Sequence, residues 1–100
     1  MANKKYEQGK RAEYKVRKTL ENEGYTCFRS AGSKGLFDVI AINSCEVRLI
    51  QVKFTEKDKY TEDKNCKLAK NLGVPENTKK ELWIFYSYRG HEIRELKEEE

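Results

Sequence analysis

Two apolar strands joined by a short turn, residues 37–53, constrain this chain more than any other feature. The segment FDVIAINSCEVRLIQVK has Asp38 as its second residue, and the run DVIAI, nearly all apolar after this acid, is typical of a strand buried on both faces. In the returning strand VRLIQVK, successive side chains alternate between faces, so Gln51 and Lys53 project together. The hairpin therefore brings an acid, an amide and a lysine to neighbouring strand ends.

The flanking segments predict an α/β fold in a single domain over residues 1–100. Apolar residues recur at steps of three and four over residues 4–23 and predict a helix that ends at Gly24. A second helix is expected over residues 63–72, and polar connection over 76–80. The remaining apolar and alternating runs predict strands over residues 25–30, 37–43, 47–54, 81–88 and 91–96. This order of elements indicates a central sheet with helices on its faces.

The charge distribution favours a polyanionic partner. The net charge is +4, yet five of the last nine residues are Glu, so the rest of the chain is clearly basic. Ordinary solubility charge is the alternative explanation. Three cysteines, without the spacing of a zinc site, fit a reducing compartment, and no apolar run approaches the ~20 residues that span a bilayer. We therefore expect a cytoplasmic, intracellular protein that is not in a membrane.

Two further polar positions are candidates for a site. Glu13 lies beside the apolar stripe of the first helix, where an acid is either a solvated boundary residue or a group directed at a site. Ser33 lies in AGSKG, a polar glycine-containing loop suited to phosphate but without the spacing of a Walker loop. The alternatives without a functional role are that Ser33 only forms a turn and that Asp38 only caps a strand.

Together these residues predict a metal-dependent phosphodiesterase. Mg²⁺ binds hard oxygen ligands, commonly one or two carboxylates with water and a substrate phosphate. Asp38 supplies a carboxylate, Gln51 a neutral carbonyl oxygen, and Glu13 a candidate second carboxylate. Lys53 is a positive charge that can orient the attacking water and stabilise the phosphate in the transition state.

Four sequence segments in register resemble the PD-(D/E)xK nuclease superfamily, and within it the archaeal-type Holliday junction resolvases. They are QGKRAEYKV, GYTCFRSAGSKG, FDVIAI and LIQVK, and the resemblance covers about residues 8–55. It implies a restriction-endonuclease-like fold with a mixed five-stranded sheet. It also implies a Mg²⁺- or Mn²⁺-dependent homodimer that nicks two opposed strands of a four-way DNA junction.

The resemblance also implies a role for each matched residue. Glu13, Asp38 and Gln51 occupy the metal positions, Lys53 the position of the catalytic lysine, and Ser33 that of the loop serine near the scissile phosphate. The residues expected to contact DNA are Lys10, Arg11, Arg29, Ser30, Lys34 and Lys57.

The chain departs from the family pattern at several positions. Phe37 replaces the proline of the superfamily name, Tyr14 stands where an arginine is usual, and Gln51 replaces the usual Glu. The short length suggests a trimmed version encoded by a virus or mobile element. Two alternatives stay open: a related nuclease that cuts flapped, nicked or linear DNA, and a DNA-binding module that lost catalysis through the change at Gln51.

The aromatic run near the end of the chain has two interpretations. Trp83, Tyr86 and Tyr88 either stack on bases or form a strand that is core on one face and interface on the other, and the second is favoured. His91 is expected to be structural or solvent-exposed.

The Gln51→Glu variant should bind Mg²⁺ more tightly than the natural chain, because glutamine keeps the carbonyl oxygen but lacks one negative charge. The measurement is the metal dependence of DNA cleavage by the two proteins. Unchanged metal dependence would remove Gln51 from the metal site.

Overall fold

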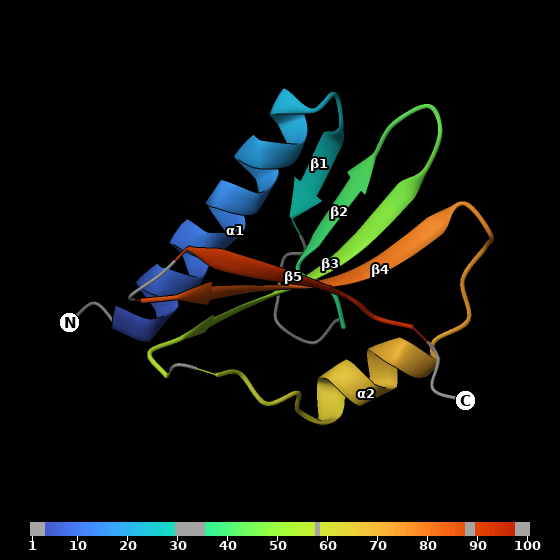
Figure 1. The fold of residues 1–100 in the computed structure, drawn as a ribbon. Coiled ribbons are helices and arrows are strands. Elements are labelled where there is room, and N and C mark those ends of the chain that lie inside the picture. Colours follow the sequence, from blue (N-terminus) through green and yellow to red (C-terminus); the bar gives the residue numbers. More distant parts are fainter. Residues whose placement is uncertain (1–3, 30–35, 58, 88–89, 98–100) are drawn as a thin grey trace.

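A computed structural model describes residues 4–29, 36–57, 59–87 and 90–97. Its elements follow in the order α1 Lys4–Asn22, β1 Thr26–Arg29, β2 Val39–Ile42, β3 Val47–Thr55, α2 Lys64–Asn71, β4 Thr78–Tyr86 and β5 His91–Glu95. The strands form one five-stranded sheet in sequential order (Figure 1). Only β3 and β4 pair in parallel, across the α2 crossover, and the other neighbours are antiparallel. The predicted α/β fold with a mixed sheet is confirmed.

Helix α1 covers one face of the sheet, beside β1, β2 and β3 (Figure 1). Its buried side chains Ala12, Val16 and Leu20 pack against a cluster from β2, β3 and β4 that includes Ile50 and Trp83. The spacing of three and four residues that predicted the helix is therefore the spacing of its buried stripe. The helix gives way to a turn in which Gly24 has φ of 96°, a conformation that glycine adopts without steric cost.

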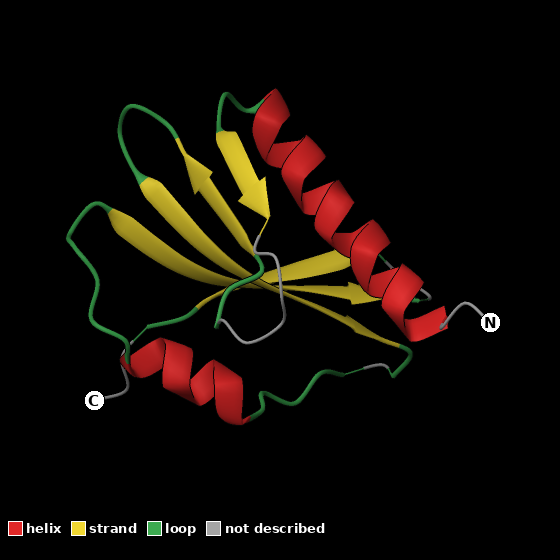
Figure 2. Cartoon of the chain, turned by 180° about the vertical axis from the view of Figure 1, so that it is seen from behind, coloured by secondary structure: helices red, strands yellow, loops and turns green. Residues whose placement is uncertain are grey.

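Helix α2 lies against the opposite face, as Figure 2 shows from behind. Cys66 and Ala69 of this helix are buried with Leu82 and Ile84 of β4. Asp63 caps the helix, because its carboxylate accepts a hydrogen bond of 3.0 Å from the Cys66 N–H. Among the described residues, no helix is long and apolar enough to cross a membrane.

The start of β4 was predicted wrongly as polar connection. The strand begins at Thr78 because its ladder with β3 extends back to the Val47–Thr78 pair. Lys80 is buried there, and its ammonium donates to the carbonyls of Lys70 and Leu72 at the end of α2. A lysine that satisfies unpaired helix carbonyls can therefore occupy a core strand.

Two burial predictions were also wrong. β2 is not buried on both faces, since Ile42 is exposed where α2 does not reach. The run from Glu81 to Tyr86, in contrast, is buried at every position because helices pack on both sides of β4. The described part of this strand is therefore core on both faces.

A buried ion pair joins the two parallel strands. Arg48 of β3 donates two hydrogen bonds, of 3.0 and 2.7 Å, to the Glu81 carboxylate of β4. The same carboxylate accepts a hydrogen bond of 2.9 Å from the Trp83 indole. Glu81 therefore satisfies two buried donor groups at once.

Replacing Glu81 with Ala should lower the free energy of unfolding by about 3–5 kcal/mol, because the half-buried Arg48 guanidinium and the buried Trp83 indole would lose their shared acceptor. Urea denaturation measures the change. The control is Glu95→Ala, which breaks the exposed pair with Lys97 and should cost less than about 1 kcal/mol. Equal losses in the two variants would contradict the structural role of Glu81.

Candidate functional site

Asp38 is fixed where the β2–β3 ladder ends. The register of the two strands stops at the Val39–Ile50 pair, and β3 continues to Thr55. The Asp38 N–H donates to the Ile50 carbonyl at 2.8 Å, and the Asp38 carboxylate accepts from the Val52 N–H at 2.8 Å. The side chain thus satisfies a backbone group that the ladder leaves unpaired, and the carboxylate is held firmly.

The surroundings of Asp38 oppose its ionisation. Burial raises the pKa of this carboxyl above its ordinary value of 3.8, and the nearby charge of Glu13 raises it further. The Val52 N–H, the Lys53 ammonium and the Arg29 guanidinium lower the pKa but do not compensate. Asp38 therefore lies within electrostatic reach of both Glu13 and Lys53, as the sequence predicted.

Glu13 projects from α1 toward the end of β1. Its carboxylate accepts a hydrogen bond of 2.7 Å from Arg29 Nε, and the Glu13 side chain is only 19% exposed. The sequence left open whether this acid is a solvated boundary residue or is directed at a site. Glu13 is half-buried and paired with Arg29, and its charge raises the pKa of Asp38, so the structure favours the second alternative.

Gln51 and Lys53 project from the face of β3 that lies away from α1, toward α2. The buried Gln51 amide accepts a hydrogen bond of 3.1 Å from the Cys66 thiol. Lys53 Nζ lies 3.6 Å from the Asp63 carboxylate. The predicted alternation along β3 is confirmed, and the first turn of α2 contacts both side chains.

Asp38 therefore stands between two layers. Glu13 approaches it from the helix on one face of the sheet, and Lys53 from the strand face that carries the other helix. The ladder ends at this point, so side chains from both layers can meet around a single carboxylate.

The predicted DNA contacts are only partly described. Lys10 and Arg11 are exposed on α1, and Arg29 is at the end of β1 with Glu13 as its partner. Lys57 is exposed after β3 and lines a hollow of about 430 Å³ together with Lys53. Ser30, Ser33 and Lys34 lie outside the described residues.

Two oxygen donors of the site suit a divalent cation. Glu13 and Asp38 repel each other as anions, and a hard cation between carboxylates would relieve that repulsion. Within the described ranges, no group of three or more His, Cys, Asp or Glu side chains is arranged to hold a metal. Gln51 stands outside that residue set, and its amide oxygen is already bonded to Cys66. The two carboxylates are the residues that could hold the ion, although Glu13 would have to share its carboxylate with Arg29, and Gln51 would have to exchange its thiol partner.

Sequence reasoning missed the part played by Asp63. This residue caps α2 and contacts Lys53, so it ties the predicted lysine to the helix. Its position three residues before Cys66 is the spacing of an N-cap interaction, and this was the available signal. The contact with Lys53 depends on how α2 returns over the sheet, which local sequence does not reveal.

Comparisons with known proteins agree on one family. Residues 4–99 match the archaeal Holliday junction resolvase (Hjc) family. A segment of 56 residues, 56% of this chain, is 41% identical to the crossover junction endodeoxyribonuclease Hjc of Methanocaldococcus jannaschii. The match spans 41% of that relative's length.

The fold has a counterpart among solved structures. The structure of Archaeoglobus fulgidus Hjc, a Holliday junction resolvase from an archaeal hyperthermophile, matches with a TM-score of 0.71 and 17% sequence identity. The match covers 89% of this chain and 73% of that one. The restriction-endonuclease-like architecture expected from the sequence is therefore confirmed.

Asp38→Asn should raise the free energy of unfolding at pH 7 in metal-free buffer. A folded-state pKa that is raised means that stability is greatest below the unfolded value near 3.8 and falls as pH rises through the raised value. The gain from the uncharged amide should therefore shrink as the pH is lowered toward 3.8. Denaturant titrations of both proteins across this range measure it.

Asp63→Asn is the matched control with the opposite sign. Burial of Asp63 opposes ionisation, but the Cys66 N–H and Lys53 outweigh burial and hold the pKa below 3.8. Its charge thus contributes stability at neutral pH that is lost as the pH falls through the lowered value. The variant should be less stable at pH 7, and asparagine still caps the helix. Equal signs for the two variants would contradict this electrostatic description.

Proposed function

Since this chain belongs to the archaeal Holliday junction resolvase family, we propose that it is an endonuclease that resolves four-way DNA junctions by paired nicks. The observation that carries the proposal is that Asp38 is held where the β2–β3 ladder ends, with the charges of Glu13 and Lys53 near enough to shift its pKa. Phosphodiester hydrolysis needs negative ligands for a cation and a positive charge near the phosphate, and this arrangement supplies both.

In this proposal, Glu13 and Asp38 hold Mg²⁺ or Mn²⁺, and Gln51 joins them if its amide oxygen leaves the Cys66 thiol. The bound ion would supply Lewis acidity and a water of lowered pKa. The burial and the like charge that disfavour ionisation of Asp38 are the conditions under which a carboxylate pair gains most from a cation.

Lys53 supplies a positive charge that is oriented in advance. Its ammonium lies on the face of β3 that also carries Gln51, and Asp63 restrains it from 3.6 Å. A donor held in place needs little reorganisation when negative charge develops on the phosphate oxygens. Lys53 is therefore assigned to the attacking water or the scissile phosphate.

Substrate binding is assigned to the basic surface around this site. Lys10, Arg11, Arg29 and Lys57 are exposed cations that suit contacts with backbone phosphates, and Arg29 would share its guanidinium with Glu13. Affinity built on such contacts falls steeply as salt is added. A four-way junction has two-fold symmetry and two nicks need two sites, so the proposal includes a homodimer.

Asp38→Ala should reduce cleavage of a four-way junction with a mobile core by about a hundredfold or more, the scale on which one preorganised transition-state interaction acts. The assay follows nicks in opposed strands in Mg²⁺ or Mn²⁺. The exposed Glu21→Ala on α1 is the control and should cleave like the natural chain.

Other outcomes would distinguish the alternatives. Equal cleavage of linear or flapped duplex would indicate a different nuclease of this superfamily. Junction binding without cleavage in either metal would indicate a DNA-binding module, which the amide at Gln51 favours. A monomer by sedimentation at the assay concentration would exclude the symmetric paired mechanism.

A further inference from the structure

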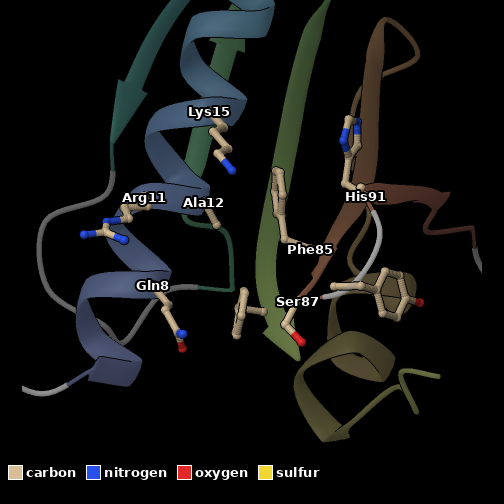
Figure 3. A pocket seen from close by; sticks show the side chains of 10 residues that line it. Gln8, Arg11, Ala12, Lys15, Phe85, Ser87 and His91 are labelled. Carbon is tan, nitrogen blue, oxygen red and sulfur yellow. The ribbon is translucent and has the colours of Figure 1, made fainter. Parts of the chain in front are cut away.

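A cleft of about 580 Å³ lies on the α1 side of the sheet, between that helix and the ends of β4 and β5 (Figure 3). Its size is within the range of roughly 300–1,000 Å³ typical of small-molecule pockets. Gln8 and Lys15 border it on the helix, and Phe54, Phe85 and His91 border it on the strands. None of these residues except Phe54 adjoins the proposed catalytic group in sequence.

Aromatic rings form the strand side of this cleft. His91 pairs with Phe85 across the β4–β5 ladder, and their ring centroids are 5.2 Å apart. His91 also stacks parallel on Trp83, with centroids 5.3 Å apart and an interplanar angle of 1°. Since Trp83 is buried and His91 is exposed, the imidazole is the outer member of a ring stack. Such a platform suits a planar ring.

The opposite side of the cleft is cationic. Figure 3 shows Lys15 directed from α1 toward Phe85, with its ammonium 6.0 Å from the ring centroid, whereas the Arg11 guanidinium points outward. Among the described residues that line the cleft, none is acidic. The neighbouring acid of β5, Glu92, accepts hydrogen bonds from Tyr86 and Arg94. A planar ring that carries an anionic group complements this combination.

The cleft continues toward the proposed catalytic site. Gln8 and Phe54 line both the cleft and the hollow that contains Lys53 and Lys57. A DNA strand bound along one hollow can therefore continue past Gln8 and Phe54 into the other, toward His91 and Lys15.

We propose that this cleft binds an unpaired nucleotide of the DNA substrate, with its base on His91 and a phosphate at Lys15. The inference rests on the proposed nuclease function and extends it, because it adds recognition of a base that has left the stack. The base pairs at the branch point of a four-way junction lack one continuous stacking neighbour, so their bases leave the stack more readily than those of continuous duplex.

Binding of a short single-stranded oligothymidylate and of a blunt hairpin duplex, both in EDTA, tests the proposal. Trp83 is the only tryptophan, so its fluorescence reports on the His91 stack. The oligothymidylate should change this emission. His91→Ala should weaken its binding about fivefold or more, as loss of one base-stacking partner does. Duplex affinity should be unchanged, and His91→Phe should restore oligothymidylate binding.

Lys15→Gln provides a second variant with a matched control. It should weaken oligothymidylate binding more than Lys18→Gln, which removes the same charge from the same helix outside the cleft. Equal effects of the two lysine variants, or equal affinity of His91→Ala and the natural chain, would overturn the proposal. A changed oligomeric state of His91→Ala with unaltered oligothymidylate binding would assign the cleft to a second copy of the chain.

These assays are independent of cleavage, since no metal is present. If His91→Ala cuts junctions normally and binds oligothymidylate as the natural chain does, nucleotide binding in the cleft is refuted and the nuclease function is not. If the natural chain binds oligothymidylate but does not cut junctions, and His91→Ala loses that binding, the nuclease function is refuted and nucleotide binding in the cleft is kept.

Discussion

The hydrogen bonds of Asp38 to β3 are the constraint on which the candidate site depends. β3 is the central strand, paired on both sides, and its direction is fixed by β2 and β4 together. Asp38 attaches to it through both its own N–H and its carboxylate. A carboxylate held in this way cannot turn away from Glu13 and Lys53, even though burial and repulsion oppose its charge.

Successive side chains of β3 point to opposite faces of the sheet, so packing residues lie on one face and candidate site residues on the other. Ile50 and Val52 face α1 and join its core cluster, whereas Gln51 and Lys53 face α2. The same strand therefore packs against α1 with one face and presents the candidate site residues toward α2 with the other. This is why Cys66 and Asp63 of the α2 region contact site residues although neither lies near them in sequence.

Much of the fold follows from local pattern, because α1 has a buried stripe of clear period and the side chains of β3 alternate between two packed layers. The pattern failed where tertiary context outweighs polarity. Lys80 looks like a loop residue, yet the end of α2 supplies two carbonyls for its ammonium inside the core. Ile42 looks like a core residue, yet no described helix covers it. Both errors concern partners that are distant in sequence.

In the candidate site too, neighbours in sequence could be predicted, whereas contacts between distant segments could not. Spacing alone grouped Asp38, Gln51 and Lys53, since a hairpin joins their strand ends. The hydrogen bond from Cys66 to Gln51 needed the crossover helix to be in place. The cleft at His91 also arises from several elements, because Trp83, Phe85 and Lys15 meet there only after α1 packs on the sheet.

The buried Glu81 and the half-buried Asp38 show how structural and functional charges differ. Glu81 has Arg48 and the Trp83 indole as donors, so its carboxylate has partners within the fold. Asp38 has one backbone donor, a like charge nearby and a raised pKa. A chain selected only for stability would have no use for such an acid beside Glu13. Lys53 and Arg29 offset this cost only in part, and this is the physical reason to propose a cation at Asp38 rather than at Glu81.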